Sequence, residues 1–158
     1  RAARPPVPGA VAQDEGETDD AVQLGLEHGA FVKEFPVPVA LALLQRGRDR
    51  YNIFCAACHG LDGYGRGAVA VRAEELLEER AGETKAMRPS SYHSPELRGR
   101  EVGSLFHTIG NGLRAMPPYA GQIPVADRWA IVAYVRALQR SQYASVDDVP
   151  PEERRELR

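Results

Sequence analysis

The chain has 158 residues, of which 43% are hydrophobic, and this suits one domain with extensions. Its formal net charge of −2 gives no electrostatic reason to expect nucleic-acid binding. No stretch of about 18 apolar residues is present that could form a membrane-spanning helix.

The first 38 residues have a composition that does not suit a packed core. They include five of the 12 prolines, and an acidic run at residues 14–20 separates the two proline groups. Such a segment buries too little apolar surface to offset the entropy lost on ordering. We expect residues 1–38 to form a long extended or irregular N-terminal arm. This arm is either disordered or ordered on a partner protein through its apolar side chains, Leu24, Leu26, Phe31, Val32 and Phe35.

A helical pattern begins after Pro38 and continues to the first cysteine. Apolar or small residues recur at steps of three and four, at Val39, Leu43, Leu44, Gly47, Tyr51 and Phe54. Proline is favoured in the first turn of a helix, so Pro38 is a plausible start. The pattern predicts a helix that runs into the sequence Cys55-Ala56-Ala57-Cys58-His59.

This pentapeptide is C-x-x-C-H, the sequence that attaches a c-type haem. Two thiols one helical turn apart can add to the two vinyl groups of one porphyrin, and His59 then lies under the ring as the proximal ligand of the iron. A thioredoxin-like redox pair would need a βαβ context, and a structural zinc site would need more thiolate or imidazole ligands. We therefore predict one haem c, covalently bound through Cys55 and Cys58.

Covalent haem attachment also predicts a compartment. It implies a periplasmic or other extracytoplasmic location, so we expect a leader that was removed before Arg1 or lies outside these residues. A lipid anchor upstream of residue 1 is an open alternative.

Four glycines follow the motif between Gly60 and Gly67 and predict an irregular loop with close backbone approach, here beside the porphyrin edge. A phosphate-binding loop is the competing interpretation, but the lysine and the preceding strand of that motif are absent. Beyond this loop, the pattern predicts a surface helix over residues 69–80 and a helix over Glu101–Gly110. Between them, Ser94 and Pro95 predict the N-terminus of a short helical turn.

A methionine followed by two prolines lies in the loop Asn111–Tyr119, just before the last predicted helix. The prolines stiffen this loop, so Met116 could hold its thioether against the iron at a fixed position. The alternative is a methionine that fills space in the core. Four other residues are possible sixth ligands: Met87, His93, His107 and His28.

The last predicted helix is Pro124–Gln139, with an apolar side formed by Trp129, Ile131, Val132, Tyr134, Val135 and Leu138. Residues 141–158 are polar and predict a C-terminal tail. Four residues in loops near the two ligand segments are candidates for hydrogen bonds to the haem propionates, although each could be a plain surface residue: Arg66, Arg88, Tyr92 and Arg114.

Between residues 39 and 140 the chain resembles the class I cytochromes c. Gly47 and Tyr51 precede the motif at positions where that family has a glycine and an aromatic residue facing the C-terminal helix. The resemblance implies an all-α fold with crossed N- and C-terminal helices around haem c, and it places Gly47 against Ile131–Val135.

One position departs from the class I pattern. Many members have a proline after the glycine loop, and its carbonyl accepts a hydrogen bond from the ligand histidine. Here Gly67 and Ala68 occupy that region, without a proline. The sequence therefore does not identify the carbonyl that orients His59.

Three longer stretches, residues 35–60, 88–93 and 111–139, are similar to the monohaem cytochrome c component of alternative complex III. That complex is a bacterial membrane-bound quinol:electron-acceptor oxidoreductase. The resemblance implies a peripheral electron-transfer subunit that receives electrons from a multihaem or iron–sulfur subunit. It would pass them to a soluble carrier or to an oxidase.

A histidine and a thioether close both axial positions of the iron, so the expected function is electron transfer and not catalysis by the chain itself. Methionine ligation raises the reduction potential relative to ligation by two histidines. Two alternatives stay open. One is a freely diffusing periplasmic monohaem carrier, and the other is a haem enzyme or the cytochrome domain of a dehydrogenase, in which the sixth ligand leaves the iron.

Overall fold

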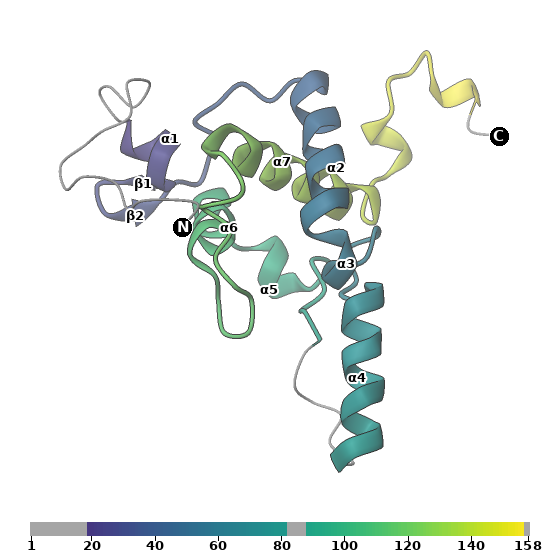
Figure 1. The fold of residues 1–158 in the computed structure, drawn as a ribbon. Helices are drawn as coiled ribbons and strands as arrows, with labels where there is room; N and C mark the ends of the chain where they lie inside the picture. The colour runs from purple at the N-terminus through teal and green to yellow at the C-terminus, as the bar shows by residue number, and fades with distance from the viewer. Residues whose placement is uncertain (1–18, 82–87, 157–158) are drawn as a thin grey trace.

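The architecture is built from helices, in accordance with the three- and four-residue spacing of the apolar side chains. The computed structural model describes residues 19–81 and 88–156. In chain order (Figure 1) the elements are α1 (Asp20–Leu24), β1 (Leu26–Glu27), β2 (Ala30–Phe31), α2 (Leu41–Phe54), α3 (Ala56–His59), α4 (Ala68–Ala81), α5 (Pro95–Arg98), α6 (Val102–Asn111) and α7 (Val125–Ser141). The predicted all-α fold class is confirmed, with one two-stranded sheet added within the described residues.

Helices α2 and α7 cross near the centre of the molecule and make the most extensive contact between the described elements. Gly47 lies at the crossing, because a Cβ atom there would stand 2.0 Å from the carbonyl oxygen of Ala130 and 3.0 Å from Cβ of Tyr134. Only a residue without a side chain allows the two backbones to approach this closely. The structure therefore shows the crossed helices that the class I resemblance implied.

An acidic side chain of α7 also contacts α2. Asp127 is buried, with 3% of its surface exposed, and its carboxylate pairs with Arg46 and with Arg50, whose Nε lies 3.1 Å from Oδ2. A buried carboxylate is tolerated when it is paired in this way. The two arginines lie one turn apart on α2, so the pair fixes how α2 is rotated against the start of α7.

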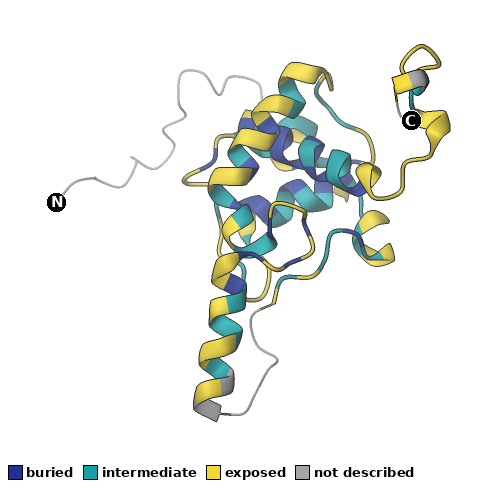
Figure 2. Cartoon of the chain, turned by 90° about the vertical axis from the view of Figure 1, so that its right-hand side faces the viewer, coloured by how far each residue is buried: buried dark blue, intermediate teal, exposed yellow. Residues whose placement is uncertain are grey.

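The core lies between α2, α6 and α7, where Figure 2 shows the buried residues. Trp129 of α7 is fully buried and stacks on Phe106 of α6, with ring centroids 4.3 Å apart and planes at 17°. Tyr51 of α2 is also fully buried, and its hydroxyl donates to the carbonyl of Gly60 at 2.6 Å. Tyr51 therefore connects α2 directly to Gly60, the first residue after the C-x-x-C-H motif.

The described part of the N-terminal segment differs from the expected extended arm. Residues 19–38 contain α1 and an antiparallel hairpin of β1 and β2, and Val32 is buried at 8% exposure. The Trp129 indole donates to the carbonyl of Val22 at 2.7 Å. On α6, a Cβ atom at Gly103 would lie 2.2 Å from the carbonyl oxygen of Gly25. The segment is thus ordered by the surface of α6 and α7, while residues 1–18 lie outside the described residues.

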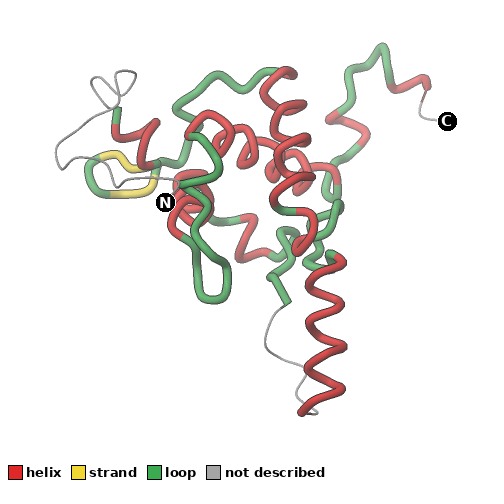
Figure 3. Tube along the Cα trace, in the orientation of Figure 1, coloured by secondary structure: helices red, strands yellow, loops and turns green. Residues whose placement is uncertain are grey.

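Two further parts extend from the core. Helix α4 projects away from it and is mostly exposed in Figure 2, as expected for a surface helix. Figure 3 shows the long loop between α6 and α7, which carries the predicted methionine motif. No described helix combines the length and the apolar character needed to cross a membrane.

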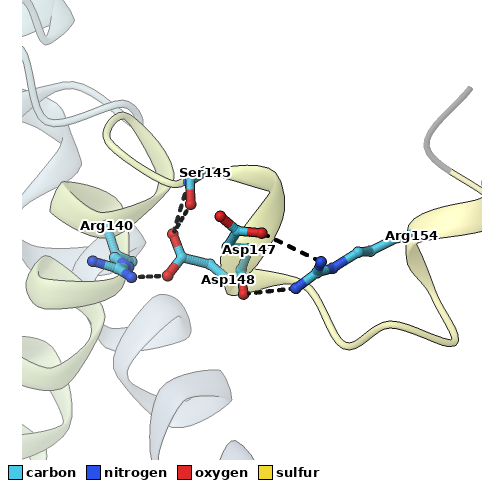
Figure 4. Close-up of polar contacts among 5 residues, drawn as sticks. All are labelled: Arg140, Ser145, Asp147, Asp148 and Arg154. Atoms are coloured by element: carbon cyan, nitrogen blue, oxygen red, sulfur yellow. Dashed lines mark hydrogen bonds and ion pairs between the residues drawn. The ribbon is translucent and has the colours of Figure 1, made fainter.

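The described residues of the C-terminal tail include two 3₁₀ turns, Val146–Asp148 and Arg154–Glu156. Ser145 caps the first turn, since its backbone N–H donates to the Asp148 carboxylate at 2.7 Å. Figure 4 shows that Arg140 of α7 pairs with Asp148 and that Arg154 pairs with Asp147. The first pair attaches the tail to the end of α7, and the second joins the two 3₁₀ turns. Ion pairs that solvent can reach contribute little to stability.

We expect Gly47→Ala to lower the free energy of unfolding by at least about 2 kcal/mol, because the new methyl group would overlap the backbone of α7. Gly121→Ala is the matched control, since a Cβ atom at Gly121 has no atom within 4 Å. Its effect should stay within about 0.5 kcal/mol. Denaturant unfolding of the haem-loaded proteins measures both, and equal effects would contradict the close crossing.

Candidate functional site

The C-x-x-C-H motif forms a tight turn at the end of α2. Cys55 is the C-cap of α2, and its N–H donates to the carbonyl of Tyr51 at 2.8 Å. The Cys55 carbonyl then accepts from the N–H groups of Cys58 at 3.1 Å and His59 at 2.8 Å. Both thiols are free. One helical turn, α3, therefore carries the second cysteine and the histidine directly after the first.

Met116 lies in a loop whose backbone is held in a narrow bend. Its N–H donates to the carbonyl of Leu113 and its carbonyl accepts from the Leu113 N–H, both at 3.0 Å. Gly112 has φ of +77°, and a Cβ atom there would lie 2.5 Å from the Met116 carbonyl oxygen. Farther along the loop, the N–H of Tyr119 donates to the carbonyl of Ile109 in α6 at 3.0 Å. The bend and this anchor fix the loop relative to α6.

A cavity of about 560 Å³ lies between the motif and this loop, and Cys55, Cys58, His59 and Met116 all line it. Its volume is within the range of sites that take organic ligands. Most of its other walls are apolar, and they come from α2, α6, α7 and the loop before α7: Phe54, Leu105, Ile109, Ile123, Ile131, Val132 and Val135. The cavity therefore suits a large, mostly apolar group that meets two thiols, an imidazole and a thioether.

The other candidates for the sixth ligand do not meet at this cavity. His93 uses Nε2 to bond the carbonyl of Asp62 at 2.7 Å, and His107 packs against the edge of the Phe31 ring. His28 is exposed in the turn between β1 and β2. None of these three histidines lines the cavity. Met87 lies outside the described residues.

Three of the four residues predicted to contact propionates line the cavity: Arg88, Tyr92 and Arg114. Arg88 is exposed, and its guanidinium pairs with the Glu74 carboxylate of α4 at 2.6 Å. Arg114 is exposed, with φ of +55°. Arg66 is exposed in the glycine loop and does not line the cavity. Its short sequence distance from His59 does not bring it to the site.

Sequence reasoning did not identify Arg100 and Tyr119, which also line the cavity. Arg100 pairs with Glu96 at 2.9 Å, four residues earlier. That spacing is the ordinary pattern of a surface helix pair, so the sequence gives no sign that Arg100 faces a cavity. Tyr119 follows the two prolines after Met116, and its place in this stiff loop could have suggested it.

His59 is held in an apolar environment, and burial lowers the pKa of its imidazole to about 4. The ring is therefore neutral at neutral pH, which is the form that binds metals. Its Nδ1 is buried and has no hydrogen-bond partner among the described residues. The ring stacks on Tyr92, with centroids 4.7 Å apart and planes at 13°.

The glycine loop packs against protein backbone. Gly65 and Gly67 donate to the carbonyls of His59 at 2.8 Å and Cys58 at 3.1 Å. A Cβ atom would lie 2.1 Å from the Pro89 carbonyl oxygen at Gly65, and 2.3 Å from the Ala57 carbonyl oxygen at Gly67. The glycines thus let the chain fold back onto the motif and onto residue 89, rather than only over a porphyrin edge.

These residues fit a covalently attached haem. Two free thiols one turn apart, a neutral imidazole and a thioether line one cavity with apolar walls. The described residues contain no group of three or more His, Cys, Asp or Glu side chains that could hold a metal ion by themselves. The structure therefore gives no support to the alternative of a zinc site built around the two cysteines.

Comparison with known proteins identifies a family. Residues 42–135, more than half of the chain, match the family described as cytochrome c oxidase, cbb3-type, subunit III. No curated protein matches the chain at a significant level. A solved chain of the reducing HAO-like protein complex of Kuenenia stuttgartiensis is similar in fold, with a TM-score of 0.53 and 20% identity over 75% of this chain. The match covers 54% of that solved chain, or about half of its length.

We expect the native protein to be heavier than its polypeptide by the mass of one haem. Each thiol adds across a vinyl group, so its hydrogen and sulfur both stay in the product. In a Cys55→Ala, Cys58→Ala double variant, acidified organic solvent should extract all of the haem, whereas the native chain should keep it. Mass spectrometry of the denatured chains measures this, and a native chain without the adduct would contradict the assignment.

Proposed function

Because the chain belongs to the c-type cytochrome family described as cytochrome c oxidase, cbb3-type, subunit III, we propose that it is an electron-transfer subunit of a membrane-bound redox complex. Family membership implies covalent haem c, which supplies a one-electron change between ferric and ferrous iron. The observation that carries the site assignment is the convergence of Cys55, Cys58, His59 and Met116 on one cavity. In this proposal the cysteines hold the porphyrin and the other two residues bind the iron.

The chain's own residues then have defined tasks. The neutral His59 offers a nitrogen lone pair without first losing a proton. Met116 would offer its thioether sulfur as the second ligand, and its two backbone hydrogen bonds to Leu113 hold the main chain from which that side chain extends. The apolar walls from α6 and α7 would keep water from the haem and disfavour the extra positive charge of the ferric state, which would raise the reduction potential. With both ligands bound, the iron would exchange electrons and would have no open coordination position for a substrate.

Replacing Met116 with leucine should abolish the weak red absorption band of ferric haem with histidine and methionine ligands. It should also lower the reduction potential and allow carbon monoxide to bind the reduced protein, because the sixth position is no longer closed by a thioether. Met87→Leu is the matched control, being the same substitution at the other methionine of the chain. Loss of the band in Met87→Leu and its survival in Met116→Leu would reverse the assignment.

The proposed complex is alternative complex III, in which the chain would be the monohaem cytochrome c component. The support is the similarity of residues 35–60, 88–93 and 111–139 to that component. We further propose a periplasmic position at the membrane surface, held by partner subunits or by a lipid anchor upstream of residue 1. A multihaem or iron–sulfur subunit would donate the electron, and a soluble carrier or an oxidase would accept it.

The N-terminal residues are the proposed attachment to the complex, and the fold shows which of them can be removed in a test. Deleting residues 1–38 would remove Val32 from the core and the Val22 carbonyl that accepts from Trp129. Deleting residues 2–18 spares both contacts and leaves any upstream leader or anchor in place. The shorter deletion therefore tests attachment without disturbing the described core.

We expect the full chain to co-purify with other redox subunits from detergent-solubilised membranes, and the deletion of residues 2–18 to weaken this association at least tenfold. The control is the haem absorption spectrum and thermal stability of the deletion variant, which should match those of the full chain. If the full chain sediments as a free monomer, the alternative of a diffusing carrier replaces the proposal. Undiminished co-purification of the deletion variant would exclude residues 2–18 as the attachment.

A further inference from the structure

We propose that Tyr92 is a positioning residue that orients the proximal imidazole of His59 by ring stacking, in the place of the usual hydrogen bond from its second nitrogen. The inference rests on the proposed role of His59 as the iron ligand. A metal-bound histidine nearly always donates its other N–H to a carbonyl or carboxylate, which fixes the ring and makes it a stronger electron donor. The structure offers His59 a different support.

The first observation is the absence of an acceptor. His59 Nδ1 is buried and has no hydrogen-bond partner among the described residues. The nearby glycine loop uses its own N–H groups to bond the carbonyls of Cys58 and His59. It therefore contributes donors to the motif, whereas an imidazole N–H needs an acceptor.

The second observation is the geometry of the Tyr92 ring. It lies nearly parallel to the imidazole, with centroids 4.7 Å apart and planes at 13°. A flat ring held against one face of the imidazole resists rotation about the bond from nitrogen to iron. The Tyr92 ring also meets the Tyr51 ring edge-on, with the ring centroids 6.2 Å apart and the planes at 60°. Tyr92 is thus packed between the buried core and the ligand.

The third observation is that the backbone of Tyr92 is fixed on both sides. Its N–H donates to the carbonyl of Gly63 at 2.9 Å, and its carbonyl accepts from Nε2 of Gln139 on α7 at 2.8 Å. Gln139 is itself buried, at 5% exposure. A Cβ atom at Gly63 would lie 2.9 Å from Cδ2 of Tyr92, so the glycine loop also sets the ring position. A residue held in this way can act as a rigid support.

This arrangement has an electronic consequence. An imidazole whose second N–H is not donated is a weaker electron donor than one that is hydrogen-bonded. Weaker donation stabilises ferric iron less and raises the reduction potential. The role also differs from a hydrogen bond to a propionate, because stacking depends on the ring of Tyr92 and not on its hydroxyl.

The test compares Tyr92→Phe with Tyr92→Leu in the haem-loaded full chain. Tyr92→Phe keeps the ring, and its reduction potential and haem-methyl NMR shifts, which report the imidazole plane, should match the native protein. Tyr92→Leu removes the ring and admits water as an acceptor for Nδ1–H, so its potential should fall and its methyl shifts should change. Tyr134→Leu is the packing control, because the Tyr134 ring also packs on Tyr51, with the ring centroids 5.3 Å apart. It should leave the methyl shifts unchanged.

Equal changes in Tyr92→Phe and Tyr92→Leu would assign the effect to the hydroxyl and overturn the inference, as would native behaviour of Tyr92→Leu. If Tyr92→Leu does not fold, Gln139→Met takes its place, because it removes the donor to the Tyr92 carbonyl. It should change the same methyl shifts to a smaller degree, and unchanged shifts would overturn the inference. A native chain without covalent haem would instead refute the proposed function itself.

Discussion

The close crossing of α2 and α7 at Gly47 is the constraint on which the rest of the structure depends. A Cβ atom at this position would collide with the Ala130 carbonyl, so the helices meet backbone to backbone. The end of α2 carries the C-x-x-C-H turn, and α7 also supplies Ile131, Val132 and Val135 to the cavity wall. The position of the C-x-x-C-H turn relative to α7 therefore depends on glycine at position 47.

The helices and the motif could be predicted because their signals are local. Apolar spacing marks each helix, and Ser94 caps α5 as predicted, with its Oγ accepting from Leu97 at 3.3 Å. The order of residues 19–38 could not be predicted in the same way. Their backbone carbonyls at Val22 and Gly25 lie against Trp129 and Gly103, which follow many residues later in the chain. Composition describes what a segment can bury by itself, and not which surface is available to it.

Some residues of the site could likewise be predicted from local sequence signals, and others could not. Cys55, Cys58 and His59 are adjacent in sequence, and Met116 has the two prolines after it as a local sign. Propionate contacts were predicted from nearness in sequence to the ligand segments, and Arg66 does not line the cavity although it is close to His59 in sequence. Tyr92 was identified for its hydroxyl, whereas its position against His59 depends on Gly63 and α7 together.

The two sides of the cavity are fixed by different helices. On the His59 side, α7 contacts α2 through Ala130 and holds Tyr92 through Gln139, so one helix positions both the C-x-x-C-H turn and the ring stacked on His59. On the Met116 side, the loop is anchored to α6 by the bond from Tyr119 to Ile109. Because α6 and α7 are joined by the stacked Phe106 and Trp129, both sides of the cavity belong to a single packed core. Under the proposed ligation by His59 and Met116, this shared core would hold both side chains in place while the iron changes its charge.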